Sequence, residues 1–65
     1  MNLRPFLLEK RMKMLRIQKV AEITTLSKST IYRLIAKGDF PQGKKLSSRT
    51  VVWLEAEIID WINNS

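Results

Sequence analysis

The stretch "SKSTIYRLIAKGDFP", residues Ser27–Pro41, contains the start, the body and the end of one short helix. Ser27 is a good N-cap, because its hydroxyl can accept a hydrogen bond from the free N–H groups of the first helical turn. Gly38 supplies the left-handed residue that commonly ends a helix, and Pro41 prevents the helix from continuing. We therefore predict a helix over about Lys28–Lys37.

The predicted helix has an apolar side and a basic side. Ile31, Leu34 and Ile35 repeat at spacings of three and four, which is the pattern of a stripe that packs on a core. With 100° per residue, the opposite side contains no acid. Its residues are Ser29, Arg33, Ala36 and Lys37, with Thr30 and Tyr32 at its flanks. Such a side is often only a solvated surface, but a basic face also suits an acidic partner.

The basic residues are concentrated in one part of the 65-residue chain, whose net charge is +6. Residues 1–49 contain all 12 lysines and arginines and three of the six acids, which gives this part a net charge of +9. Residues 50–65 contain the other three acids and no base, so their net charge is −3. A molecule with this polarity is expected to present a basic side to an acidic polymer or surface.

The composition argues against catalysis. The chain has no cysteine and no histidine, which excludes disulfides, Cys/His zinc sites and catalysis by a thiol or an imidazole. It has only two glycines, so a glycine-rich phosphate loop is absent. Glu57 and Asp60 would share a helix flank, which makes a paired-acid site conceivable, but a solvated face is the simpler interpretation. We expect no enzyme, and no cofactor, metal or small-molecule ligand.

The chain has the length of one small domain, which we assign to residues 13–65. Residues 1–12 are either a basic N-terminal arm or the start of a short helix from Pro5 to about Met14. Translation from Met1, from Met12 or from Met14 is compatible with the sequence. No apolar run approaches the ~20 residues of a membrane span, and the apolar "FLL" near the start is shorter than the ~7–15 residues of a signal-peptide core. We expect a soluble, cytoplasmic, nucleoid-associated protein of prokaryotic or phage origin.

Three more elements are predicted around the central helix. Apolar residues repeat at helical spacing over Ile17–Thr24, and Lys13–Arg16 reads as a short extended lead-in to this helix. The β-forming residues around the polar tip Ser47–Arg49 predict a hairpin with two lysines in its first strand. A final helix over about Glu55–Asn63 has acids in its first turn, where the helix dipole favours them. Trp53 and Trp61 are expected to anchor this last helix against the first two.

Two short helices joined by about three residues, the second of them basic, indicate a helix-turn-helix, and the hairpin with a basic tip indicates its winged form. The predicted fold class is therefore mainly α, with three helices and a small β-hairpin. A helix fits the major groove of DNA, where Arg33 can contact guanine with two hydrogen bonds. Other basic and polar residues can hold phosphates, and a basic wing can reach the backbone or the minor groove. The candidate DNA-binding residues are Lys28, Ser29, Thr30, Tyr32, Arg33, Lys37, Lys44, Lys45 and Arg49.

Three separate motifs resemble one protein family. "LSKSTIYR" at Leu26–Arg33, "GDFP" at Gly38–Pro41 and "WLEAEIIDW" at Trp53–Trp61 stand in the order and spacing of the AlpA family, small phage-encoded regulators related to MerR-type winged helix-turn-helix domains. The resemblance covers about residues 13–63. The clearest departure is Thr25, where the family usually has glycine, because a β-branched residue resists a positive φ.

The resemblance implies binding to double-stranded DNA, without chemistry on it. The expected role is regulation of transcription, for example of an integrase gene, or that of an excisionase, which bends attachment-site DNA and steers the integrase towards excision. Expected partners are DNA, the integrase and neighbouring copies of the chain itself. The main alternative is a protein–protein inhibitor or adaptor that binds a response regulator or a polymerase subunit, with the acidic last helix as a second contact surface. A membrane-binding helix ranks last, because the exposed side of the central helix has no large apolar group.

Overall fold

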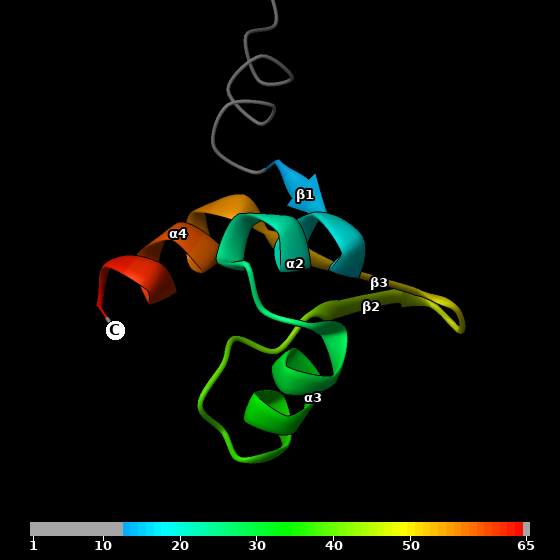
Figure 1. The fold of residues 1–65 in the computed structure, drawn as a ribbon. Coiled ribbons are helices and arrows are strands. Elements are labelled where there is room, and N and C mark those ends of the chain that lie inside the picture. The colour runs from blue at the N-terminus through cyan, green and yellow to red at the C-terminus, as the bar shows by residue number, and fades with distance from the viewer. Residues whose placement is uncertain (1–12, 65) are drawn as a thin grey trace, which may run out of the picture.

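The computed structural model describes residues 13–64 (Figure 1). Residues 1–12, on which the predicted arm or short helix falls, lie outside the described part. Met14, where such a helix would end, is already extended in the structure. The elements are β1 Met14–Leu15, α2 Ile17–Thr24, α3 Lys28–Ala36, β2 Lys44–Ser47, β3 Thr50–Leu54 and α4 Glu55–Asn63.

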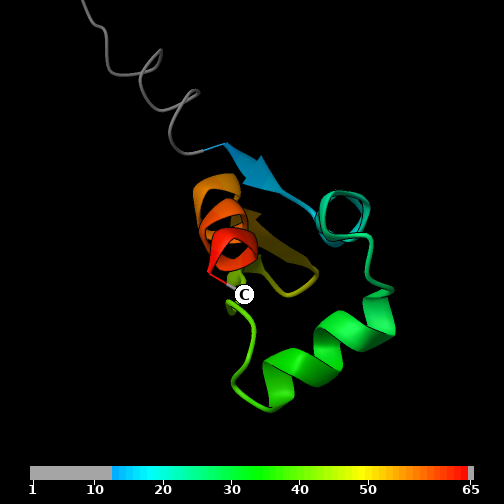
Figure 2. The same ribbon diagram turned by 60° about the vertical axis from the view of Figure 1, so that its left-hand side comes forward.

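The winged helix-turn-helix fold is confirmed. The helices α2 and α4 begin and end where the periodicity of the sequence predicts. The three residues between α2 and α3 form the turn, and β2 and β3 form the antiparallel hairpin. In both views β1 and α3 lie at opposite ends of the molecule, with the rest of the sheet, α2 and α4 between them (Figures 1 and 2).

Both predicted ends of α3 are built as the sequence indicates. The Ser27 hydroxyl accepts a hydrogen bond from the Thr30 N–H at 3.1 Å, which caps the N-terminus. At the other end Gly38 has φ +79°, and the N–H of Asp39 donates to the Leu34 carbonyl at 2.8 Å. The N–H of Gly38 also donates to the carbonyl of Ile35 at 3.0 Å, which completes a Schellman motif. The helix stops one residue earlier than predicted, because Lys37 takes the C-cap position.

The turn between α2 and α3 has a left-handed residue that is not glycine. Thr25 has φ 63° and ψ 14°, so the chain keeps the geometry that glycine would provide and places a β-branched side chain in it. The Thr24 hydroxyl donates to the Val20 carbonyl at 2.8 Å and accepts from the Leu26 N–H at 3.3 Å. These bonds on either side of Thr25 help to hold the turn in place.

The sheet has a third strand, β1, which comes from the beginning of the described chain. β1 pairs antiparallel with β3, so that Leu15 lies opposite Trp53, and the strand order is β1-β3-β2. The predicted extended lead-in is therefore a strand. The Glu55 N–H also donates to the Lys13 carbonyl at 2.8 Å, just beyond the paired residues. The hairpin tip is shorter than predicted, because Ser47 pairs with Thr50.

The core takes one residue from each helix, one from each of the strands β1 and β3, and one from the loop after α3. Its buried residues are Leu15, Val20, Ile31, Phe40, Trp53 and Ile58. The side chains of Ile31 and Ile58 are fully buried, which explains how two short helices are held although neither would be stable alone. Core packing therefore fixes the orientation of α3, and with it the direction of its exposed side.

The two tryptophans fix the loop between α3 and β2. Trp53 donates its indole N–H to the Pro41 carbonyl at 2.9 Å, and Trp61 donates its own to the Asp39 carbonyl at 2.8 Å. The Trp61 ring also packs on Phe40, with 4.6 Å between ring centroids. Trp53 lies in the second strand of the hairpin and in the core, and Trp61 packs against this core, as predicted. Together the two residues hold the loop that leads from α3 into the wing.

Candidate nucleic-acid interface

The exposed side of α3 carries most of the predicted DNA-binding residues. The Ile31 side chain is buried and those of Leu34 and Ile35 are half-buried, so the apolar stripe faces inward as predicted. The side chains of Lys28, Ser29, Tyr32, Arg33 and Lys37 are exposed. The helix thus presents hydrogen-bond donors and positive charge to the outside over its whole length.

Thr30 is placed differently from its neighbours. It is half-buried, and its hydroxyl oxygen accepts hydrogen bonds from the Ser27 hydroxyl at 2.9 Å and from Arg33 Nη2 at 3.2 Å. Thr30 therefore links the N-cap to Arg33 and restrains the guanidinium on the surface of the helix. Contact between Thr30 and a base stays a prediction.

The two lysines of the hairpin point to opposite faces of the sheet. Lys44 lies opposite Val52 and Lys45 lies opposite Val51, and adjacent residues of a strand point to opposite faces of a sheet. The side chain of Lys44 lines a hollow with Leu46 and other residues of the outer face. The sequence grouped Lys44 with Lys45, but the structure places them on two faces of the wing.

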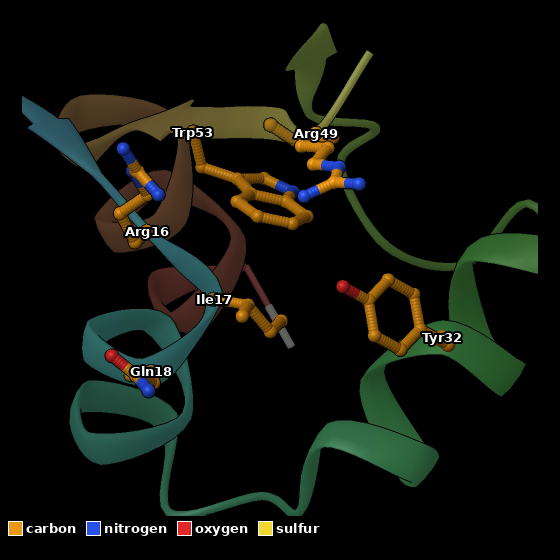
Figure 3. Close-up of a pocket in the computed structure, with 7 residues that line it drawn as sticks. Arg16, Ile17, Gln18, Tyr32, Arg49 and Trp53 are labelled. Atoms are coloured by element: carbon orange, nitrogen blue, oxygen red, sulfur yellow. The ribbon is translucent and has the colours of Figure 1, made fainter.

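One cleft brings Tyr32 of α3 together with Arg49 of the hairpin tip. It has a volume of about 220 Å³ and is lined by Arg16, Ile17, Gln18, Tyr32, Arg49, Val51 and Trp53 (Figure 3). In the figure the Tyr32 hydroxyl points into the space below the Trp53 indole, and Arg16 and Arg49 lie on either side of this ring.

The sequence did not indicate Arg16 and Gln18 as candidate binding residues. Arg16 is the N-cap residue of α2 and makes no side-chain capping bond there. The sequence placed Arg16 in a lead-in segment, and no local pattern indicated that this segment pairs with β3. The pairing brings Arg16 next to the wing, although 33 positions separate it from Arg49.

Among residues 13–64 no acid forms an ion pair with the basic residues of α3 or of the hairpin, although Glu57 lines the same hollow as Lys44 and Asp39 is exposed after α3. The ion pair found in this part of the chain joins Lys19 to Glu22 on α2, with 3.3 Å between Nζ and Oε1. Three acids, Glu55, Glu57 and Asp60, lie on α4. Within the same residues no group of acids is arranged to hold a metal ion, and no helix is long and apolar enough to cross a membrane. The described surface is thus polarised in the way that the charge pattern predicts.

Comparison with known proteins connects this geometry to a family. The family model described as "Prophage CP4-57 regulatory protein (AlpA)" matches residues 13–65. Among curated proteins, the chain is similar to the uncharacterized protein ORF88 of Enterobacteria phage P4, with 44% identity over 48 residues. These residues are 74% of this chain and 54% of ORF88, so the chain spans about half the length of that relative. No solved structure gives a significant match.

The matched residues include every element of the winged helix-turn-helix, from β1 to α4. The three motifs that carry the resemblance in the sequence also have defined places in the structure: the turn and α3, the loop after α3, and β3 with α4. The chain therefore belongs to the AlpA family of prophage regulatory proteins.

Proposed function

We propose that this chain is a sequence-specific, double-stranded DNA-binding regulator of phage type. In this proposal α3 enters the major groove and reads base edges with Arg33, while the hairpin tip reaches the backbone or the adjacent minor groove with Arg49. Lys28, Lys37 and Lys45 hold phosphates and fix the position of α3 along the duplex.

One observation carries the proposal: an exposed helix face with cations and no acid, oriented by an apolar stripe that faces the core. The Arg33 guanidinium donates one hydrogen bond to the Thr30 hydroxyl at 3.2 Å, which favours a position close to the helix surface. Pre-positioning of a side chain lowers the entropy that is lost when it binds. A family of regulators is also the setting in which such a face is expected to meet DNA.

The test is a selection of preferred duplexes from a random pool, followed by fluorescence-anisotropy titrations of the selected duplex and of a mixed-sequence duplex. Arg33→Ala is expected to reduce the discrimination between the two by about 1–3 kcal/mol, because it removes a contact with a base. Lys37→Ala is expected to weaken both complexes by the same factor, since a phosphate contact does not depend on sequence. Affinity should fall steeply with salt.

The matched pair makes the result interpretable, because both side chains are exposed and both changes remove one positive charge. If Arg33→Ala weakened both duplexes equally and left the discrimination intact, α3 would not read the sequence through Arg33. If the wild-type chain bound no duplex at low salt, the proposed function would be wrong.

The biological role that we propose is regulation of prophage genes, such as an integrase gene, or assistance to excision at the attachment site. Both roles place the protein in the bacterial cytoplasm, on the nucleoid. A single module of this size covers few base pairs, so we expect neighbouring copies to bind together at repeated sites. Footprinting on the attachment region and on the integrase promoter would separate the two roles.

A second function is favoured by the exposed surface of α4. Ile59 and Ile62 are 45% and 39% exposed, and Asp60 lies between them in the sequence. An acidic helix with exposed apolar residues suits contact with another protein, such as an integrase, a response regulator or a polymerase subunit. Recovery of such a partner after nuclease treatment, together with no duplex binding at low salt, would favour this role over the first.

A further inference from the structure

The cleft between the start of α2, α3 and the hairpin tip has the composition of an anion site. Two arginines, a tyrosine hydroxyl and a glutamine amide line it, and no acid does. Among residues 13–64 neither Arg16 nor Arg49 has an acid within ion-pair distance. Both arginines are exposed at the edge of the cleft, so their charges are available to an anion that enters it.

The cleft has a rigid floor. The Trp53 side chain, only 2% exposed, lines it, and the indole N–H is bonded to the Pro41 carbonyl at 2.9 Å. Ile17 and Val51 are half-buried on its walls. The polar groups at the rim therefore stand on a fixed apolar base, so an anion would meet them with little reorganisation of the core.

The size and position of the cleft indicate the kind of anion. Pockets for small molecules have about 300–1,000 Å³ and enclose most of their ligand, whereas this cleft has about 220 Å³ and is open. It suits one charged group of a larger molecule. Tyr32 lies next to Arg33 in α3, so a duplex that receives α3 in its major groove would bring its backbone past the cleft.

We propose that the cleft binds one phosphate of the DNA backbone, held between Arg16 and Arg49 with the Tyr32 hydroxyl as a further donor. Arg16 is thereby a DNA-binding residue outside the predicted set. Guanidinium groups suit this role, because their planar arrays of donors match the oxygens of a phosphate. The first turn of α2 has no acid, and the dipole of this helix favours an anion near its N-terminus, where Arg16 lies.

This inference rests on the proposed function and adds one consequence to it. A phosphate in the cleft would contact three elements at once: the β1–α2 junction, α3 and the wing. The position of the wing relative to α3 would then be fixed by the DNA backbone. Arg16 contributes affinity and register to every sequence alike, in contrast to Arg33, which contributes discrimination.

The test combines charge-removing variants with duplexes in which single phosphates are neutralised. Arg16→Gln and Arg49→Gln remove the two cations, and Lys19→Gln removes an equal charge from the exposed surface of α2, outside the cleft. Each protein is titrated against the selected duplex and against a set of duplexes that carry one methylphosphonate each. Circular dichroism and thermal unfolding check that every variant is folded.

We expect one backbone position at which the methylphosphonate weakens wild-type binding by about 10-fold, the factor for loss of a charged hydrogen bond. For Arg16→Gln and for Arg49→Gln the same methylphosphonate should change binding by less than about two-fold, because the bond is already absent. For Lys19→Gln the full effect should remain. The salt dependence of Arg16→Gln should be shallower by about one phosphate equivalent.

The failure of this inference can be told apart from the failure of the proposed function. If the wild-type protein binds duplex DNA but Arg16→Gln behaves like Lys19→Gln at every position, the cleft does not hold a phosphate. If Arg16→Gln and Arg49→Gln abolish the methylphosphonate effect at two different backbone positions, the two arginines do not share one phosphate, and the inference is wrong as well. If the wild-type protein binds no duplex, the proposed function itself fails.

Discussion

Replacement of Thr25 by glycine is expected to stabilise the protein. Thr25 has φ 63° and ψ 14°, a conformation that costs an L-residue about 1–2 kcal/mol and that suits a β-branched residue least. Glycine adopts it without strain, but gives the unfolded chain more freedom, which costs about 0.4–1 kcal/mol. The Thr25 side chain is exposed, and water can replace the bond from its hydroxyl to the Thr24 carbonyl.

The balance is a gain of about 1 kcal/mol in the free energy of unfolding, or a rise of about 4–8 °C in Tm for a domain of this size. Urea and thermal denaturation followed by far-UV circular dichroism measure both quantities. Thr25→Ala is the matched control, because it removes the hydroxyl and keeps the Cβ in the left-handed region. Its stability should stay within about 0.5 kcal/mol of the wild-type value.

The reasoning would be refuted if Thr25→Gly were no more stable than the wild-type protein. It would also fail if Thr25→Ala gained as much as Thr25→Gly, since the gain would then come from the lost hydroxyl. Duplex binding should be the same in all three proteins once each is fully folded. Thr25 lies in the turn before α3, so it is neither part of that helix nor a lining residue of the cleft.

The two glycines offer a further comparison by the same denaturation assays. Gly38→Ala should lower the free energy of unfolding by about 1 kcal/mol through backbone strain, because φ is +79° and a Cβ would meet no atom within 4 Å. A neutral result would mean that the helix end tolerates another conformation. Gly43→Ala should cost about 1–3 kcal/mol for a steric reason, since its Cβ would lie 2.5 Å from Val51 Cγ1 and 2.9 Å from Trp53 Cε2. A stability equal to that of the wild-type protein would show that the hairpin moves away from the loop at little cost.

The path from α3 to the wing is held by the molecule's own side chains. The indoles of Trp53 and Trp61 donate to carbonyls at both ends of the short segment 39–41, and Phe40 packs beneath Trp61. Both tryptophans belong to motifs that the sequence matched to the family. Their role is to set the position of the wing relative to α3, which the proposed contacts of Arg33 and Arg49 with one duplex require.

Among the predicted site residues, the sequence located those on α3 better than those on the wing. The face of a helix follows from a spacing of 3.6 residues, so the exposure of Arg33 and Lys37 could be read directly. The face of a strand depends on its register with another strand. Adjacent strand residues alternate, so the sequence alone implies that Lys44 and Lys45 point to opposite faces. Which of the two shares a face with Val51 and Trp53 depends on the register with β3, and a bulge near Leu46 alters this register toward the hairpin tip.

Caps, turn residues and periodicity act over a few neighbouring positions, so local sequence patterns predict the fold class, the hairpin and the helix ends to within one residue. Three features arise only when distant segments meet in the folded chain: the pairing of β1 with β3, the hydrogen bonds of the indoles, and the cleft lined by Arg16 and Arg49. The tertiary structure also decided that Thr25 keeps a left-handed turn, because core packing of α2 and α3 fixes the path between them. These features depend on contacts between residues that are far apart in the sequence, and such contacts leave no local sequence pattern.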